Sequence, residues 1–217
     1  MPANSWRWIV VVCAFAATTL EVSVPIWAGL HTPNYSHLHQ YLSELGQSGA
    51  PTGTWVSNAG FLPTGVLILT FLLALKAFLP SSRRATWGII ASMGVGIGYI
   101  AAGLAPCDPG CPTWGTLSQN VHTITGYYHY GGAILGLGLF LSAFRSQRVW
   151  RNLVPITTLG IVLAVVGAAG MIILPGWKGA FQRIAELGFF GWACFTAWNL
   201  ATRRAEVISQ PTIPEEN

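Results

Sequence analysis

Six long apolar runs constrain this chain more than any other feature of its sequence. They span about residues 7–29, 59–79, 85–105, 122–144, 153–174 and 179–201. A helix needs roughly 20 mainly apolar residues to cross the hydrocarbon core of a bilayer. Because the bilayer offers no water to pair backbone N–H and C=O groups, each run is expected to be an α-helix. The sequence therefore predicts an all-α bundle of six transmembrane helices.

The low content of charged residues supports a membrane protein. Only 8% of the 217 residues are charged and 52% are hydrophobic, whereas a soluble domain carries about 25% charged residues. The net charge of +4 does not indicate a nucleic-acid partner, because the basic residues occur in twos and threes between apolar runs. We expect a single membrane domain over residues 1–205 and a disordered polar tail over 206–217.

The basic residues also predict the orientation of the chain. Short cytoplasmic loops collect lysine and arginine. In a six-pass arrangement one side contains only Lys178 and Arg183. The other side contains Arg7, Lys76, Arg83, Arg84, Arg145, Arg148, Arg151, Arg203 and Arg204. This distribution predicts that both termini are cytoplasmic and that the protein resides in the inner (plasma) membrane.

Residues capable of chemistry gather on the predicted outer side. Two acids lie inside apolar runs, Glu21 and Glu186, and an ionisable residue within a transmembrane run is a functional candidate by default. Arg183 precedes Glu186 by one turn and can pair with it, whereas Glu21 needs Arg183, Lys178 or a histidine from across the bundle. We hypothesise that Glu21, Glu186 and His122 line one outward-opening polar cavity. The candidate ligand-binding residues are Glu21, Ser43, Glu44, Asp108, His122, His129, Arg183 and Glu186.

The cysteines and histidines offer a disulfide and, as an alternative, a metal site. Cys107 and Cys111 flank Asp-Pro-Gly, which favours a turn, and a structural disulfide suits an oxidising compartment. A redox or metal pair is the alternative. A divalent metal such as zinc would take ligands from His37, His39 and His122. His122 and His129 are about 10 Å apart along a helix, which disfavours one shared zinc. The cofactor therefore stays open.

Three short motifs resemble a known family. They are "YLSELG" at 41–46, "GLAPCD" at 103–108 and "NVHTITGYYHYGG" at 120–132. In these motifs the chain resembles the bacterial and archaeal six-pass membrane family DUF998, and distantly the damage-regulated autophagy modulators. The resemblance covers about residues 7–200 and implies a six-pass fold without an established activity. It places family motif positions at Ser43, Glu44, Gly46, Pro106, Asp108 and His122.

Three functional hypotheses follow from the sequence. The first is an outward-facing protein that binds or acts on a lipid or isoprenoid head group, with a metal-assisted hydrolase as its sharpest form. The second is a structural subunit of a larger membrane complex. The third is a proton- or cation-coupled transporter. The expected partners are membrane lipids and other membrane subunits, and the question of catalysis is left open.

Overall fold

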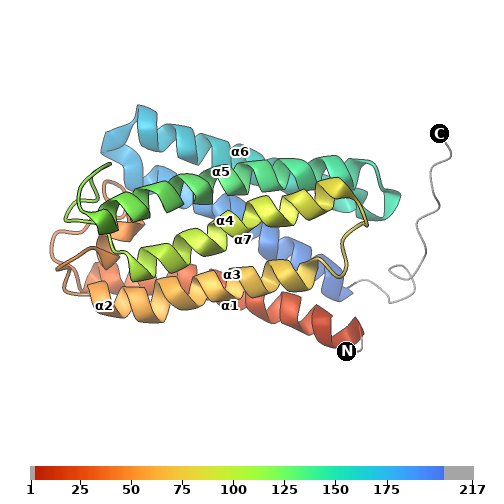
Figure 1. The fold of residues 1–217 in the computed structure, drawn as a ribbon, viewed down its shortest axis with the longest axis horizontal. Coiled ribbons are helices and arrows are strands. Elements are labelled where there is room, and N and C mark those ends of the chain that lie inside the picture. The colour runs from red at the N-terminus through yellow and green to blue at the C-terminus, as the bar shows by residue number, and fades with distance from the viewer. Residues whose placement is uncertain (1–2, 203–217) are drawn as a thin grey trace.

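The computed structural model describes residues 3–202, which form a bundle of long helices (Figure 1). No strand occurs in this part of the chain, so the predicted all-α class is confirmed. The predicted tail at 206–217 and the basic residues Arg203 and Arg204 lie outside the described residues. The α-helices are α1 (Ala3–Leu30), α2 (Gly53–Trp55), α3 (Leu62–Leu75), α4 (Arg83–Leu104), α5 (Leu117–Arg145), α6 (Val154–Ile173) and α7 (Lys178–Thr202).

Shorter helical turns complete the bundle. A π-helical segment, Val56–Phe61, joins α2 to α3, so that one continuous helix runs from Gly53 to Leu75. Three 3-10 helices lie in the connections, at Leu42–Gly46, Arg148–Leu153 and Pro175–Trp177. The chain begins α1 and ends α7 at the same end of the bundle (Figure 1). The loops 31–52 and 105–116 lie at the opposite end, which we call the loop end.

Side-chain caps explain where two of the helices begin. Thr116 precedes α5, and its hydroxyl oxygen accepts a hydrogen bond from the backbone N–H of Gln119 at 3.2 Å. Ser82 caps α4 in the same way, through the backbone N–H of Ala85 at 3.1 Å. Such caps satisfy N–H groups that the first turn leaves unpaired. The cap at Thr116 starts α5 five residues before the predicted run at 122–144, so that His122 lies inside the helix and not at its first position.

Glycines allow α4 and α5 to pack closely. A Cβ at Gly98 would lie 2.7 Å from the Cβ of His129, and one at Gly94 would collide with the carbonyl of Tyr128. On the facing helix, a Cβ at Gly132 would collide with the carbonyl of Ala91. Small residues at such an interface bring two helix backbones together. This contact fixes where the polar side chains of α5 point.

Aromatic side chains fill the bundle toward the end where α1 begins. The rings of Phe140 and Trp192 stack with centroids 5.1 Å apart, and Phe71 meets Trp192 edge-on at 6.1 Å. Trp192 is fully buried, and its indole N–H donates to the hydroxyl of Thr157 at 3.1 Å. The interior of this half of the bundle is therefore packed with apolar rings, and the polar groups described below lie nearer the loop end.

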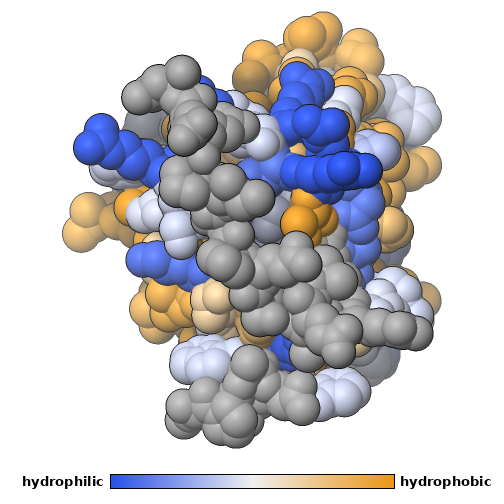
Figure 2. Space-filling model, turned by 90° about the vertical axis from the view of Figure 1, so that its right-hand side faces the viewer, coloured by the Kyte–Doolittle hydropathy of each residue, from blue (hydrophilic) through white to orange (hydrophobic). Residues whose placement is uncertain are grey.

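The helices also carry the surface expected of a membrane protein. Within residues 3–202, four helical stretches are long and apolar enough to cross a membrane, namely Trp6–Leu30, Gly53–Leu75, Arg83–Leu104 and Arg148–Ile173. Exposed side chains on α6 include Leu159, Val162 and Val166, and an extended apolar surface of this kind suits contact with lipid. Hydrophilic side chains gather at the end of the bundle where α1 begins, with apolar ones around them (Figure 2).

Candidate functional site

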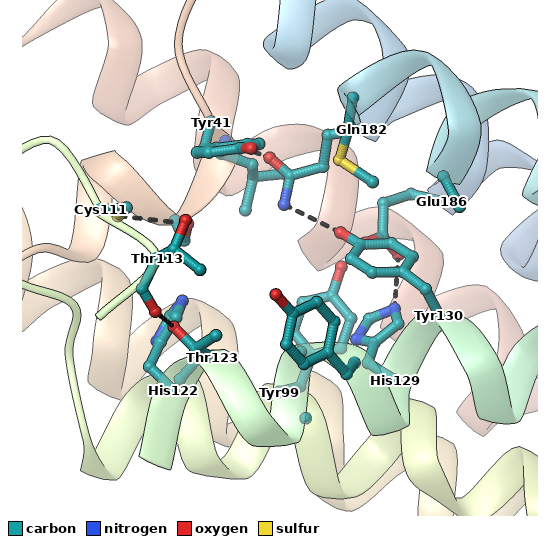
Figure 3. Close-up of a pocket in the computed structure, with 18 of the residues that line it drawn as sticks. Tyr41, Tyr99, Cys111, Thr113, His122, Thr123, His129, Tyr130, Gln182 and Glu186 are labelled. Atoms are coloured by element: carbon teal, nitrogen blue, oxygen red, sulfur yellow. Dashed lines mark hydrogen bonds and ion pairs between the residues drawn. The ribbon is translucent and has the colours of Figure 1, made fainter. Parts of the chain in front are cut away.

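A cavity of about 680 Å³ lies between α4, α5, α6 and α7 near the loop end. Its walls combine polar and apolar side chains (Figure 3). A volume of this size is typical of a small-molecule site. The polar and aromatic lining residues used below are Tyr41, Ser43, Tyr99, Cys111, Thr113, Gln119, His122, Thr123, Tyr127, His129, Tyr130, Gln182 and Glu186.

A hydrogen-bonded network from α5 and α7 forms one side of the cavity. The hydroxyl of Tyr130 donates to Oε1 of Glu186 at 3.0 Å, and the amide nitrogen of Gln182 donates to that hydroxyl at 3.0 Å. The amide oxygen of Gln182 accepts from the backbone N–H of Leu42 at 2.6 Å. Gln182 and Glu186 are four residues apart and so lie on one face of α7. The network thereby ties the loop, α5 and α7 together.

Glu186 keeps one oxygen without a hydrogen bond. Its Oε2 lies 3.3 Å from Nε2 of His129, close enough for an ion pair with a protonated imidazole. Yet this buried oxygen accepts no hydrogen bond, although Glu186 is only 5% exposed. A buried carboxylate oxygen that accepts no hydrogen bond is costly and requires an explanation. In a cavity wall, the explanation we consider is a ligand that donates to it.

Tyr99 of α4 connects the cavity to Glu21 of α1. The Tyr99 hydroxyl donates to Oε2 of Glu21, and its ring centroid lies 5.3 Å from that of His129. Glu21 is not among the residues that line the cavity. The sequence suggested Arg183, Lys178 or a histidine as the partner of Glu21, whereas the hydrogen bond to its carboxylate comes from Tyr99. A tyrosine hydroxyl, which carries no charge to be buried, supplies the hydrogen bond instead.

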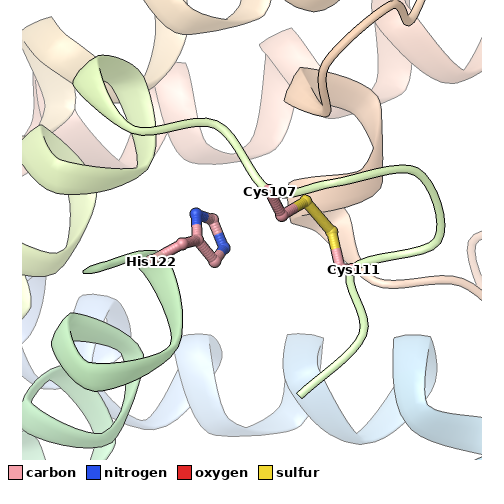
Figure 4. Close-up of side chains that lie close together, drawn as sticks. All are labelled: Cys107, Cys111 and His122. Carbon is pink, nitrogen blue, oxygen red and sulfur yellow. A yellow bond between two sulfur atoms is a disulfide. The ribbon is translucent and has the colours of Figure 1, made fainter. Parts of the chain in front are cut away.

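The opposite side of the cavity carries Cys111, Thr113, His122 and Thr123 (Figure 3). The predicted disulfide between Cys107 and Cys111 is present, with Cα atoms 5.1 Å apart (Figure 4). Ser43 lines the cavity, and its hydroxyl lies 3.5 Å from Sγ of Cys111. Nδ1 of His122 lies 3.2 Å from the carbonyl oxygen of Ala105. The disulfide therefore holds the loop end of the cavity in place.

Asp108 has a structural position outside the cavity lining. Its carboxylate accepts hydrogen bonds from the backbone N–H of Thr116 at 2.9 Å and from the Thr116 hydroxyl at 2.8 Å. Its own backbone N–H donates to Oε1 of Gln119 at 2.8 Å. These bonds clamp the 105–116 loop onto the first turn of α5. Asp108 thus positions the residues of the cavity without facing a ligand there.

Arg183 does not pair with Glu186, contrary to the sequence-based expectation. Its guanidinium donates to the carbonyl of His37, to Nδ1 of His37 and to the hydroxyl of Tyr35, each at 2.8 Å. Burial, together with the Arg183 charge, lowers the pKa of His37. Burial raises the pKa of Tyr35, with the Arg183 charge acting against it. Arg183 therefore anchors the 31–41 loop to α7.

Glu44 serves the same loop. Its carboxylate forms an ion pair with Lys178 at 2.8 Å and accepts from the backbone N–H of Tyr41 at 3.0 Å and from the amide of Gln40 at 3.0 Å. Neither Glu44 nor Arg183 is among the residues that line the cavity. The predicted candidates thus separate into cavity residues (Ser43, His122, His129 and Glu186) and residues that hold the surrounding loops (Glu44, Asp108 and Arg183). Glu21 belongs to neither group, because it links α1 to Tyr99 of α4.

The proposed histidine ligands do not meet in space. Nδ1 of His39 lies 2.6 Å from the carbonyl of Gly176, while His37 binds Arg183. Among the described residues, the potential ligand atoms that cluster are those of Cys107, Cys111 and His122, all within 4.8 Å of one another. Two of these three are sulfur atoms of the disulfide. A disulfide has no thiolate to bind zinc, so this cluster does not fit a metal in its oxidised form.

Three cavity residues were not among the candidates predicted from the sequence. Tyr99, Tyr130 and Gln182 complete the hydrogen-bonded network, but tyrosines in membrane helices are read first as interfacial anchors. The spacing of Gln182 and Glu186 offered a signal, because polar residues four apart share a helix face. The tyrosines offered none, since the atoms they bind come from other helices.

Long apolar helices with an exposed apolar surface indicate an integral membrane protein. The chain belongs to the family described as "Protein of unknown function (DUF998)", whose sequence model matches residues 15–199. No curated protein and no solved structure matches the chain.

Proposed function

We propose that this protein binds a membrane lipid, with the polar head group in the cavity and the acyl or isoprenoid chain in the bilayer. The carrying observation is the composition of the cavity. Its inner side is the Glu186–Tyr130–Gln182 network, and apolar residues of α5 and α6, including Ile134, Ala168 and Met171, complete its wall. An amphiphilic cavity of this kind favours an amphiphilic ligand over a small polar solute.

The position of the opening supports a lipid in particular. Ile172, at 79% exposed, and Tyr127, at 61% exposed, line the cavity and also lie on the outer surface of the bundle. They belong to α6 and α5, so the cavity reaches the surface beside these two helices. A lipid can enter from the membrane by this route while its head group reaches the buried carboxylate.

We further propose that all six long helices span the inner (plasma) membrane, with both termini cytoplasmic. α5 and α7 have 29 and 25 residues, long enough to cross. They run alongside the more apolar helices, along the long axis of the same bundle (Figure 1). Their lower apolarity comes in part from cavity residues such as His129, Tyr130, Gln182 and Glu186. The excess of basic residues on one side supports the orientation.

Single-cysteine labelling tests this topology. A membrane-impermeant thiol reagent applied to intact cells is expected to label a cysteine at position 108 and not one at position 84, in a background without the native cysteines. Labelling of both positions from the same side contradicts the six-pass arrangement and the outward-facing position of the cavity.

The lipid proposal is tested by obstructing the cavity without disturbing the fold. A Cβ at Gly131 meets nothing within 4 Å, and Gly131 lines the cavity. Gly131→Phe should therefore fill the cavity and reduce lipid binding. Gly138→Phe is the matched control, because Gly138 also has open space beside it on α5 but lines a separate hollow beside Arg84 and Arg145 and not this cavity. Both substitutions replace a glycine inside a helix, where glycine is about 1 kcal/mol less favourable than alanine. The two variants are therefore matched in their effect on helix propensity.

The measurement is native mass spectrometry of the purified protein released from detergent. The wild type and Gly138→Phe should retain bound lipid, and Gly131→Phe should lose it. Equal lipid retention by the two phenylalanine variants would refute the proposal and favour a structural role within a larger membrane complex. A transporter is less favoured, because the rings of Phe71, Phe140 and Trp192 occupy the bundle interior on the other side of the cavity.

A further inference from the structure

We infer that the lipid bound in this cavity carries a primary ammonium group, as an ethanolamine head group does, and that Glu186 is the residue that recognises it. This inference rests on the proposed function and names the chemical class of the ligand. The hydrogen-bond donors and acceptors, the charges and the aromatic rings around the cavity support it.

The donors at the inner side of the cavity are already used. The Tyr130 hydroxyl donates to Glu186, the Tyr99 hydroxyl donates to Glu21, and the Gln182 amide donates to Tyr130. Unused capacity is on the acceptor side, chiefly Oε2 of Glu186, which accepts no hydrogen bond although Nε2 of His129 lies 3.3 Å away. The complementary ligand group must therefore be a donor.

The charges around the cavity lead to the same conclusion. Among the described residues, those that line the cavity include Glu186 and two histidines, His122 and His129, but no lysine or arginine. The two nearby cations are held elsewhere, Arg183 by Tyr35 and His37, and Lys178 by Glu44. A phosphate or carboxylate placed against the network would face the Glu186 carboxylate with no lysine or arginine in the cavity lining to compensate it. The imidazole of His129 lies against Glu186 itself, 3.3 Å from Oε2, and burying a charge without a full counter-charge is strongly unfavourable.

Aromatic rings complete an environment suited to an ammonium ion. Tyr41, Tyr99, Tyr127 and Tyr130 all line the cavity. Cations are attracted to the faces of such rings, and combined aromatic and carboxylate groups are typical of ammonium sites. Figure 3 shows Tyr99, Tyr130 and Glu186 close together beside His129. An ammonium near Oε2 of Glu186 thus gains a counter-charge, a hydrogen-bond acceptor and neighbouring rings.

The test is a lipid titration followed by native mass spectrometry. Phosphatidylethanolamine, phosphatidylglycerol and phosphatidylcholine with identical acyl chains serve as probes. The wild type should bind phosphatidylethanolamine about tenfold more tightly than either other lipid, as expected for one hydrogen bond to a charged group. Phosphatidylcholine is informative because its ammonium has no N–H to donate. Equal binding of the three lipids to the wild type would overturn the inference without reference to any variant.

Two carboxamide variants assign the preference to one residue. Glu186→Gln keeps an oxygen for the Tyr130 hydroxyl but removes the charge, and should lower affinity for phosphatidylethanolamine to the level of phosphatidylglycerol. Glu21→Gln is the matched control, since Glu21 is a second membrane carboxylate outside the cavity lining, and it should keep the preference. An unchanged preference in Glu186→Gln contradicts the assignment.

The outcomes separate the inference from the proposed function. If Gly131→Phe abolishes binding of all three lipids while the wild type shows no preference, the lipid site stands and the ammonium inference fails. If Gly131→Phe leaves lipid binding unchanged, the proposed function itself fails. Phosphoethanolamine without acyl chains should not compete at equal concentration, and full competition by it would overturn the lipid as the source of the ammonium.

Discussion

Arg183 provides a quantitative test of how the 31–41 loop is held over the cavity. In Arg183→Met the stem of the side chain remains, but its donors are lost. Three hydrogen bonds between α7 and the loop disappear, to the carbonyl and Nδ1 of His37 and to the hydroxyl of Tyr35, each at 2.8 Å. A fourth bond, to the carbonyl of Gly179, stays within α7 and does not hold the loop.

The magnitude follows from these three bonds. A typical intramolecular hydrogen bond contributes about 1 kcal/mol net, and Arg183 is half-buried rather than fully enclosed. We therefore expect the loop to become less stable against local opening by about 3 kcal/mol. Since each 1.4 kcal/mol corresponds to a factor of ten, opening should become about 100-fold more frequent. α7 itself should remain helical, because its backbone bonds are untouched.

Hydrogen–deuterium exchange of the protein in lipid nanodiscs measures this opening. The reporting amides are those protected within the loop, including His39 and Gln40, which both donate to the carbonyl of Ser36. Arg145→Met is the control, because it removes an exposed arginine at the far end of α5. Exchange in the loop that rises less than threefold in Arg183→Met, or equally in both variants, would refute the reasoning.

Three further predictions concern pH, packing and the disulfide. Burial and the Arg183 charge lower the pKa of His37 from 6.5 in the closed loop, so the open loop binds protons more readily than the closed one. Protection of the loop amides from exchange should therefore be full above pH 6.5 and decline as the pH falls. Protection factors that stay constant down to about pH 5 contradict this. Gly132→Leu collides with a carbonyl of α4 and should lower the thermal unfolding midpoint through overpacking of about 1–3 kcal/mol, whereas Gly131→Leu beside it should not. Alkylation of the unfolded protein without a reducing agent should modify only the free cysteines, Cys13 and Cys194. Cys107 and Cys111 should be alkylated only after the disulfide has been reduced.

The membrane-embedded helices were the most predictable part of the structure. Apolar run length and backbone pairing are local properties, so the α4 run predicted at 85–105 differs by at most two residues from Arg83–Leu104. α5 was harder, because its first turn reads "LSQN". That turn is polar and helical because Thr116 caps it and Asp108 holds Thr116 in place. A run of apolar letters does not reveal such a start.

The candidate site was predicted in part. Glu186, His122 and His129 were identified because polar or ionisable side chains stand out in apolar helices, and all three line the cavity. Their partners were not identified. Arg183 was expected beside Glu186 because one turn of helix separates them, yet its side chain reaches toward the loop. Sequence spacing defines which residues share a helix face, but it does not define which neighbouring segment covers that face.

The sequence by itself determined that this chain is helical, apolar on its surface and poor in charge, since each of these properties follows from residues a few positions apart. Only the tertiary structure decided that Tyr130 binds Glu186, 56 residues away, and that Tyr99 binds Glu21, 78 residues away. The reason is physical. A buried polar group must find a partner from whichever helix packs against it, and glycines such as Gly98 and Gly132 set that packing.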